Sequence, residues 1–141
     1  MLRATGAAFV LVLVIGGLVG CGSGGTAALK VGDCVNTEPS DEGPTTIKVD
    51  CAQPHAQEVF LTFDMPDGPF PGLFEIGDAM QDECSAAFED YVGVPWEEST
   101  YTFNFAGPTE QTWAQGDHTI VCLLEDASGG NLTGSAKDTA Q

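Results

Sequence analysis

The sequence predicts an α+β domain, in which one amphipathic helix packs on a small antiparallel sheet of four or five strands and two disulfides stabilise the core. Three observations lead to this prediction. Several short segments alternate apolar and polar residues, one longer segment has helical periodicity, and four cysteines lie among these segments. A sheet with one apolar face must be covered by another element, and a single helix gives the α+β class.

The strands are predicted from alternation with a period of two. The expected extended segments are residues 29–35 (a short strand or an extended arm), 45–52, 58–65, 100–105 and 118–124. In the third of these, Val59, Leu61 and Phe63 fall on one face and Phe60 on the other. Residues 36–46, "NTEPSDEGPTT", are rich in proline, glycine and acidic residues and are expected to form a loop.

The helix is predicted from about Glu75 to Val92, where the period changes. Its apolar face consists of Met80, Cys84, Ala87, Phe88 and Tyr91. Gly93 and Pro95 follow directly and end the helix. The acidic residues on its outer face need no function, because a helix packed on a sheet keeps one side in water.

The N-terminal residues predict export. Residues 1–20 combine Arg3, an apolar stretch of about thirteen residues and small residues before Cys21, as a secretory signal does. "LVGC", residues 18–21, resembles a bacterial lipobox. This resemblance implies two or three acyl chains, palmitate among them, on Cys21, which anchor a protein stably to the outer face of the cytoplasmic membrane. Residues 21–28 are expected to form a flexible tether. The alternative is an uncleaved N-terminal membrane anchor.

The remaining chain is long enough for one core. We expect a single domain at residues 29–125, and a disordered tail at residues 126–141 because this segment has little apolar mass. From Cys21 onward, three lysines face 21 acidic residues, a formal charge of −18. Such a charge argues against nucleic acid as a partner, because nucleic-acid binding needs lysine and arginine. No dense calcium loop is present, and no cofactor or metal is expected.

With Cys21 assigned to lipid, an even number of cysteines remains. In a small extracytoplasmic domain four cysteines predict two disulfides, for which three pairings are possible. We favour Cys34–Cys51, which flanks the polar loop, and Cys84–Cys122, which would tie the helix to the last strand. The chain-entropy model gives these loops roughly 3 and 4 kcal/mol of stabilisation.

Residues 51–60, "CAQPHAQEVF", gather groups that carry chemistry in other proteins. Cys51 is expected in a disulfide and therefore not as a nucleophile. His55 and Glu58 lie three apart, which places them together on a helix but on opposite faces of a strand. They would share a metal only if the chain turns there, and Pro54 favours a turn. We favour a structural role for His55, with partner binding as an alternative.

Asp117 and His118 are consecutive in the sequence. An aspartate and a histidine can belong to the catalytic triad of a hydrolase, which also needs a serine nucleophile. No serine of the chain lies in a nucleophile-elbow pattern, so a hydrolase is the least favoured hypothesis. Trp113 is expected to cap the core, because an aromatic residue in a loop that crosses a small core is usually buried. Residues 68–74, "GPFPGLF", are the better candidate for an exposed apolar contact.

An ordered set of motifs resembles one family. "VGDCV" at 31–35, "VDCAQPHAQEV" at 49–59, Cys84 in an acid-rich helix, Trp113 with "GD" at 116–117, and "VC" at 121–122 are similar to the septum formation domain of actinobacterial envelope proteins. The similarity covers residues 31–125. The family often has arginine after "GD", where this chain has His118. The resemblance implies an extracytoplasmic domain associated with septum formation and cell division, and it implies no catalytic residue.

The leading functional hypothesis is a non-enzymatic, lipid-anchored domain that binds an envelope protein or a cell-wall component. The candidate binding residues are His55, Glu58, Trp113, Asp117 and His118. The alternative is a lipoprotein that binds a small ligand or a metal through His55, Glu58, Asp117 and His118. An envelope hydrolase is the third hypothesis.

Overall fold

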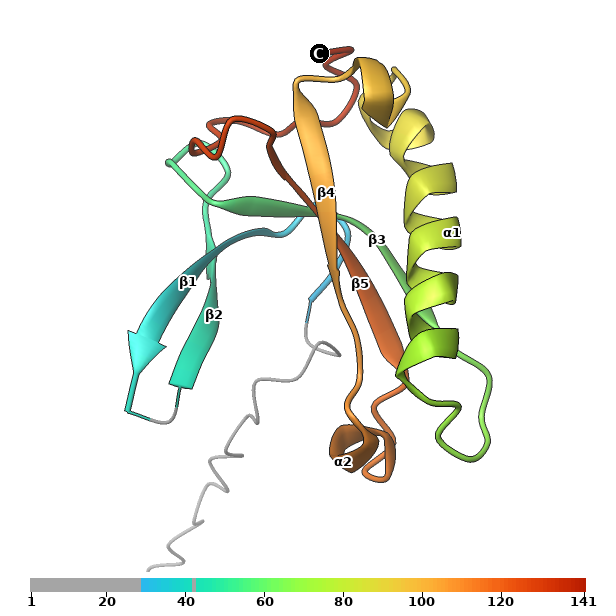
Figure 1. Ribbon diagram of the computed structural model, residues 1–141. Helices are drawn as coiled ribbons and strands as arrows, with labels where there is room; N and C mark the ends of the chain where they lie inside the picture. The colour runs from blue at the N-terminus through green and yellow to red at the C-terminus, as the bar shows by residue number, and fades with distance from the viewer. Residues whose placement is uncertain (1–28, 42) are drawn as a thin grey trace, which may run out of the picture.

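The computed structural model describes residues 29–41 and 43–141 (Figure 1). The predicted signal segment and tether, including Cys21, lie outside these residues. One five-stranded antiparallel sheet has the strand order β2-β1-β3-β5-β4. Its elements in chain order are β1 (Cys34–Ser40), β2 (Gly43–Val49), β3 (Gln57–Asp64), α1 (Leu73–Val92), the short 3-10 helix η2 (Trp96–Glu98), β4 (Tyr101–Ala106), α2 (Glu110–Trp113) and β5 (Thr119–Asp126). The predicted α+β class is therefore confirmed.

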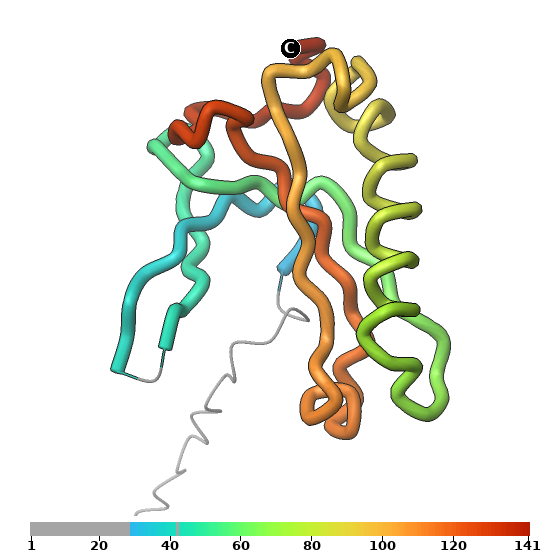
Figure 2. Tube along the Cα trace, in the orientation of Figure 1, coloured from blue at the N-terminus to red at the C-terminus, as the bar shows by residue number. Residues whose placement is uncertain are grey.

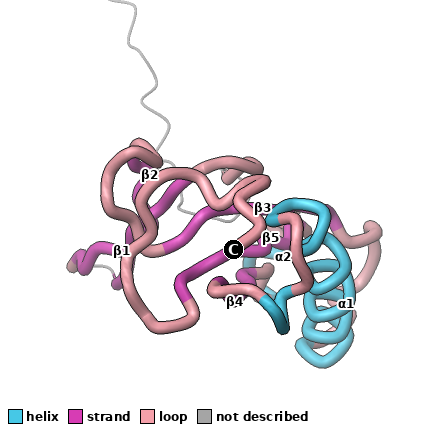
Figure 3. The backbone as a smooth tube through the Cα atoms, turned by 90° about the horizontal axis from the view of Figure 1, so that it is seen from above, coloured by secondary structure: helices cyan, strands magenta, loops and turns pink. Residues whose placement is uncertain are grey.

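Helix α1 runs along one face of the sheet, on the side of β3, β5 and β4, while the β1–β2 hairpin projects away from it (Figures 1 and 3). The main core lies between α1 and the sheet. It contains Phe60, Cys84, Phe88, Tyr91, Val92, Cys122, Leu124, Leu132 and Ala136. A smaller apolar cluster contains Val35 of β1, Val59 of β3, and Val121 and Leu123 of β5. Its residues in β3 and β5 are next to core residues in the sequence. Because consecutive strand residues point to opposite faces, this second cluster covers the other face of the sheet.

Both predicted disulfides are present, Cys34–Cys51 and Cys84–Cys122. Their Cα–Cα distances are 5.2 and 5.7 Å, within the usual range for a bridge. Cys84 and Cys122 are fully buried in the main core, so this bridge joins the middle of α1 to β5. No helix in the described part of the chain combines the length and apolar character that a membrane crossing requires.

The expected loop at residues 36–46 is instead a β-hairpin. β1 and β2 pair from Cys34↔Val49 to Ser40↔Gly43. Most of the hairpin is exposed on both faces, so residues 36–44 carry no apolar alternation from which a strand could be predicted; residues 45–49 belong to the segment 45–52 that was expected to be extended. Backbone hydrogen bonds rather than burial hold the two strands together.

The predicted faces of β3 are wrong after Val59, because the strand contains a β-bulge. Val59 pairs with Leu123 and Leu61 pairs with Cys122, which leaves Phe60 as the extra residue. Phe60 is buried in the main core, and Leu61 packs against the same core. The bulge therefore shifts the alternation by one residue and brings both side chains to the face that α1 covers.

The predicted disordered tail is also wrong, because residues 127–141 are ordered against the domain. We call residues 127–141 the C-terminal segment; in Figure 2 it runs from the end of β5 across the turn before β3 to the end of α1. Leu132 pairs with His55 in an isolated β-bridge, and the Gly134 N–H donates to the Cys51 carbonyl. The segment has little apolar mass, and these backbone hydrogen bonds help to attach it to the domain.

The C-terminal segment also completes the end of helix α1. The last carbonyls of a helix have no partner within the helix. Here the Asp138 N–H donates to the Tyr91 carbonyl, and the Ala140 N–H donates to the Val92 carbonyl. Gly93 adopts φ of 103° as the C-cap, a conformation that glycine reaches without strain. The helix end and the C-terminal segment therefore stabilise each other.

Candidate functional site

The five candidate binding residues fall into two separate groups. His55 and Glu58 lie at the start of β3, where Glu58 is opposite Leu124 of β5. Trp113, Asp117 and His118 precede the other end of β5. Six residues of extended strand separate His118 from Leu124, which corresponds to about 20 Å. The predicted metal site of His55, Glu58, Asp117 and His118 is therefore not formed as one constellation.

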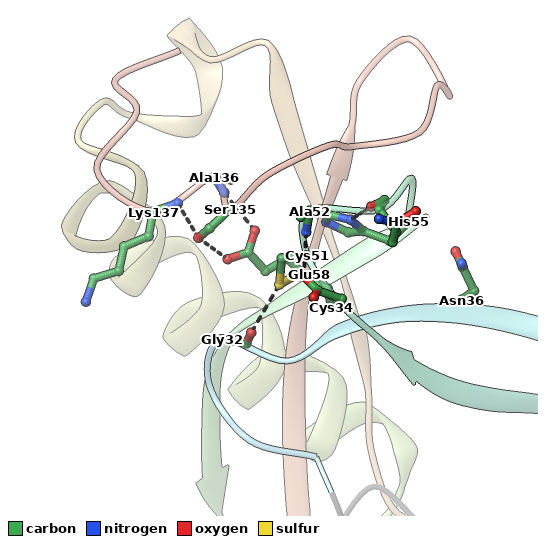
Figure 4. The surroundings of a disulfide bond; sticks show 12 residues. Gly32, Cys34, Asn36, Cys51, Ala52, His55, Glu58, Ser135, Ala136 and Lys137 are labelled. Atoms are coloured by element: carbon green, nitrogen blue, oxygen red, sulfur yellow. Dashed lines mark hydrogen bonds between the residues drawn. A yellow bond between two sulfur atoms is a disulfide. The ribbon is translucent and has the colours of Figure 1, made fainter.

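Glu58 is a fully buried carboxylate that accepts three hydrogen bonds. The Tyr91 hydroxyl donates to Oε1 at 2.7 Å and the Ser135 hydroxyl donates to Oε1 at 2.6 Å. The Ala136 N–H donates to Oε2 at 2.7 Å. Figure 4 shows the carboxylate directed toward Ser135 and Ala136 of the C-terminal segment. Glu58 thus joins β3 to both α1 and the C-terminal segment, since a buried charged group must be hydrogen-bonded to be tolerated.

Tyr91 donates one of these bonds from the last turn of α1. Burial raises the pKa of its hydroxyl well above the ordinary value, and the hydrogen bond to Glu58 raises it further. Both causes favour the neutral phenol, because the buried phenolate would lose its solvation and lie beside a carboxylate. Tyr91 therefore stays a hydrogen-bond donor across the physiological pH range.

His55 is fully buried between the turn and the C-terminal segment. Its Nδ1 lies 2.8 Å from the Gln53 carbonyl oxygen. A carbonyl oxygen only accepts, so Nδ1 carries the hydrogen and donates. In the neutral ring Nε2 is then an unprotonated acceptor. This buried atom has no hydrogen-bond partner, which is unusual for a native core.

A turn positions His55 beside Glu58. The two residues were expected on opposite faces because side chains alternate along a strand, but His55 does not lie in the strand. The Asp50 carboxylate accepts from the Ala52 N–H, and the Asp50 carbonyl accepts from the Gln53 N–H. Asn36 Oδ1 accepts from the Ala56 N–H at 2.7 Å. β3 begins only at Gln57, so His55 lies before the strand. Pro54 had suggested such a turn, because proline fixes its own φ.

Cys34 completes a buried group with His55 and Glu58. A ring nitrogen of His55, the Sγ of Cys34 and a carboxylate oxygen of Glu58 all lie within 4.8 Å of one another. These three residues come from β1, the turn and β3, and Figure 4 shows them around the Cys34–Cys51 disulfide. In the disulfide the Cys34 sulfur is not a thiolate, the form in which cysteine binds metals.

Trp113 is buried at the opposite end of the sheet, as predicted. Its ring stacks on His118 with centroids 4.1 Å apart, and its indole N–H donates to the Gly68 carbonyl at 2.8 Å. Phe70 meets the same ring edge-on at 5.9 Å. Trp113 therefore holds residues 66–72, the loop between β3 and α1, against α2.

His118 pairs with a residue that the sequence did not indicate. Its Nδ1 lies 3.0 Å from Oδ1 of Asp67, whose side chain is otherwise exposed. Asp117 accepts from the Thr119 N–H at 3.2 Å and so shapes the turn before β5. The hydrolase hypothesis needs a serine beside an imidazole, whereas the ring of His118 contacts Asp67 and Trp113.

An exposed apolar pair follows the loop that Trp113 supports. Leu73 and Phe74 form the first residues of α1 and are 72% and 94% exposed. They belong to the "GPFPGLF" segment that the sequence marks as a candidate contact. We call Leu73 and Phe74 the apolar patch. Adjacent large apolar side chains exposed on a fixed helix turn can form part of a contact with another surface.

Three residues of these sites could not be assigned from the sequence alone. Tyr91 had been placed on the apolar face of the helix, which is correct, but nothing in the pattern pointed to its bond with Glu58. Ser135 and Asp67 lie in segments with no periodicity, 77 and 51 residues from their partners Glu58 and His118. Such pairings depend on tertiary structure, which no local pattern encodes.

Comparison with known proteins places these features in a family. The model of the family described as "Septum formation" matches residues 25–141, which includes β1, the turn, α1 and the C-terminal segment. The chain belongs to the septum formation family. The sequence resemblance was therefore correct, and the family domain extends to residue 141 rather than ending near residue 125.

Two curated relatives share this similarity. "Putative lipoprotein LppN" of Mycobacterium tuberculosis (strain ATCC 25618 / H37Rv) is 32% identical over 114 residues, and the protein of the same name in Mycobacterium bovis (strain ATCC BAA-935 / AF2122/97) gives the same values. The match covers 77% of this chain and 62% of each relative. This septum formation domain thus spans less than two thirds of those proteins. No solved structure matches the chain.

Proposed function

We propose that this septum formation domain is a non-enzymatic, lipid-anchored module that binds another envelope protein through the apolar patch. The relatives named as lipoproteins and the family together support an extracytoplasmic, envelope-associated location. The lipobox-like "LVGC" supports attachment through Cys21 to the outer face of the cytoplasmic membrane. The single observation that carries the binding function is the exposure of Leu73 and Phe74 on the first turn of a rigid helix.

The patch is suited to binding because its support is preorganised. The loop before it is fixed by the Trp113 hydrogen bond to Gly68 and by the Phe70–Trp113 contact. Behind it, Ile76 and Met80 of α1 are buried with Ile120 of β5. A partner that covers Phe74 therefore pays little ordering entropy, which favours affinity. In this proposal Trp113, Asp117 and His118 position the binding surface.

The charges around the patch favour a partner with basic residues. Asp67, Glu75 and Asp78 are all exposed near the apolar pair. The formal charge of −18 from Cys21 onward adds a long-range negative field. This field opposes insertion of the patch into anionic lipid or docking on an anionic wall polymer, and it attracts a protein surface in which lysine or arginine surrounds an apolar centre.

The proposed anchor keeps the domain close to the membrane. Residue 29 follows Cys21 by eight positions, and a fully extended chain spans at most about 28 Å over this length. A partner must then present its binding surface within a few nanometres of the bilayer.

In-cell photocrosslinking tests this proposal. A photoreactive residue at position 74 should capture one envelope protein, whereas the same residue at Glu98 should not, because Glu98 is exposed in η2 beyond the opposite end of α1. The variant Phe74→Ser should abolish capture from a neighbouring reporter position and disturb septation. Normal septation together with capture of lipid alone, or with no capture, would reject the proposal.

The runner-up function, binding of a metal or small ligand, keeps one specific observation in its favour. His55 Nε2 is buried without a partner beside Glu58 and Cys34. Asp117 and His118 cannot contribute ligands to this group, because they lie near the other end of β5. The hydrolase hypothesis has no comparable observation.

A further inference from the structure

Three potential metal ligands converge at the start of β3, in a part of the molecule that the proposed partner surface does not use. We propose that reduction of the Cys34–Cys51 disulfide converts Cys34, His55 and Glu58 into a zinc(II) site. The starting observation is their mutual proximity, with all ligand atoms within 4.8 Å and all three side chains buried. This inference is independent of the patch of Leu73 and Phe74.

His55 is already arranged as metal-binding histidines are. Such histidines donate one ring N–H to a carbonyl or carboxylate, which fixes the tautomer and leaves the other nitrogen free for the metal. Nδ1 donates to the Gln53 carbonyl, and Nε2 is buried without any hydrogen-bond partner. An unsatisfied buried polar atom typically costs about 1–3 kcal/mol. A metal ion would give Nε2 the partner that the oxidised protein lacks.

Glu58 retains room for one further interaction. A carboxylate has about four lone-pair sites, and Glu58 uses three of them for Tyr91, Ser135 and Ala136. Those hydrogen bonds hold the carboxylate in place, as second-sphere contacts do at metal sites. Binding an ion through the remaining site therefore does not require the C-terminal segment to detach.

The ligand types select zinc. Sulfur, imidazole nitrogen and carboxylate oxygen together in a compact group are typical of tetrahedral Zn²⁺. Bond lengths of about 2.0–2.3 Å place neighbouring ligand atoms roughly 3.3–3.8 Å apart. The present separations of up to 4.8 Å would thus have to close by about 1 Å. Cys51, released by the same reduction, starts beside Cys34 and is available for the fourth position.

The reduction step is a thiol–disulfide exchange with a dithiol reductant. A thiolate of the reductant attacks Sγ of Cys51, the residue of the pair that is only half-buried, and Cys34 leaves as a thiolate. The second thiolate of the reductant then displaces Cys51, and the reductant leaves as its own disulfide. Two electrons and two protons pass to the protein. Zinc then bonds the Cys34 thiolate, whose proton goes to solvent.

The second disulfide is protected from the same reaction. Cys84 and Cys122 are fully buried in the main core, whereas Cys51 is only half-buried. Thiol exchange requires access to the sulfur, so mild reduction should open Cys34–Cys51 first. The core bridge between α1 and β5 would then keep the domain folded while the new site forms.

Zinc binding to the full chain, purified in detergent and treated with a chelator, tests the proposal. Two preparations are compared with the oxidised protein: wild type reduced until two thiols are free, and the variant Cys51→Ser, in which Cys34 stays a thiol. We expect one equivalent of Zn²⁺ per chain in both, at least about 100-fold tighter than in the oxidised protein. Zinc should also protect Cys34 from alkylation, as mass spectrometry would show.

Matched histidine variants separate this site from loose binding by the acidic surface. His55→Ala should weaken zinc binding at least tenfold in the reduced protein, whereas His118→Ala should leave it unchanged. If reduction loosens the fold, zinc should restore the near-ultraviolet circular dichroism, because metal binding then drives folding. Less than about a tenth of an equivalent bound in both preparations, or equal binding by His55→Ala, would overturn the proposal.

Discussion

At the scale of single residues, Glu58 is the buried group that needs the most hydrogen-bond partners. It is a buried carboxylate whose three donors come from the helix and from the C-terminal segment. Removing one partner of such a set is costly, because the others remain buried and unsatisfied. The stability of the fold therefore depends on Glu58 more than on any of the acidic residues at the surface.

The variant Glu58→Ala should lower the free energy of unfolding by about 3–5 kcal/mol, because three neutral donors lose their acceptor and each unsatisfied buried group costs about 1–3 kcal/mol. Glu58→Gln should cost less, because the amide oxygen still accepts from Tyr91 or Ser135. Urea unfolding followed by tryptophan fluorescence measures both changes. Glu97→Gln, at an exposed position of η2, is the control and should change stability by less than about 0.5 kcal/mol. A similar loss in both glutamine variants would contradict this role of Glu58.

Tyr91 predicts a loss of stability at alkaline pH. Its folded pKa is raised, chiefly by burial and then by Glu58, above the ordinary value near 10 that applies to the unfolded chain. As pH rises past about 10, the unfolded chain loses the phenolic proton first, so the contribution of Tyr91 is complete below pH 10 and declines above it.

The difference in unfolding free energy between wild type and Tyr91→Phe should therefore be constant from pH 7 to 9. Above pH 10 it should shrink by up to about 1.4 kcal/mol per pH unit. Denaturant titrations at several pH values measure this difference. A difference that stays constant up to pH 11 would show that Tyr91 does not retain its proton in the folded state.

His55 shows how far local pattern predicts a site. The sequence correctly associates "CAQPH" with a disulfide and a turn, and it indicates a structural contact between His55 and a loop carbonyl. It separates His55 from Glu58, because the strand rule assumes that both residues lie in β3. His55 lies before β3, which begins at Gln57, and its backbone pairs with Leu132, which is 77 residues away in sequence. Such a distant partner has no local signal.

At the scale of elements, helix α1 and β5 were the most predictable parts. Their apolar periods are long and uninterrupted, and both lie in the main core. Residues 45–52 were expected to be extended and overlap β2, but the pairing of β1 with β2 and the bulge at Phe60 were not predicted, since neither produces an apolar period. The order of the C-terminal segment was not predicted either. Many of its hydrogen bonds come from backbone groups, which are present in every sequence and therefore leave no pattern.

Leu132 is the point at which the C-terminal segment enters the main core. It is buried, and its backbone pairs with His55 in both directions. Leu132→Ala should lower the unfolding free energy by about 2–4 kcal/mol, through lost apolar contact and the cavity that remains. Asn131→Ala, at the adjacent exposed position, should cost less than about 0.5 kcal/mol.

Hydrogen exchange would show whether the loss is local. In Leu132→Ala, the amides of Asp138 and Ala140 should exchange faster, because their bonds to the end of α1 depend on the path of the segment. Equal stability of the two variants, or unchanged exchange at those amides, would contradict the structural role of the C-terminal segment.

At the scale of the whole molecule, the buried hydrogen-bonded cluster lies at one end of the domain and the proposed binding surface lies at the other. The disulfide Cys34–Cys51, Glu58 and the C-terminal segment gather at one end of β5, and Trp113 with the apolar patch gathers toward the other. Substitutions at the two ends should therefore have nearly additive effects on stability, because they share no partners. In the proposed zinc site, the reduced disulfide would lie at the end of β5 away from the apolar patch.

The disulfide Cys84–Cys122 lies between these two ends and joins the middle of α1 to β5 in the main core. It closes a 38-residue separation, against 17 for Cys34–Cys51. The chain-entropy model gives about 4 and 3 kcal/mol for loops of these lengths. The double variant Cys84→Ala/Cys122→Ala should thus lose at least 4 kcal/mol, because packing against Phe88 and Leu124 is lost as well.

Cys34→Ala/Cys51→Ala is the matched comparison and should lose about 3 kcal/mol, since the hairpin that it leaves free is mostly exposed. Urea unfolding without reductant measures both double variants against wild type. A loss below about 1 kcal/mol for Cys84→Ala/Cys122→Ala would mean that apolar packing alone holds α1 on the sheet. A larger loss for Cys34→Ala/Cys51→Ala than for the core pair would instead place the main constraint at the start of β3, beside the proposed zinc ligands.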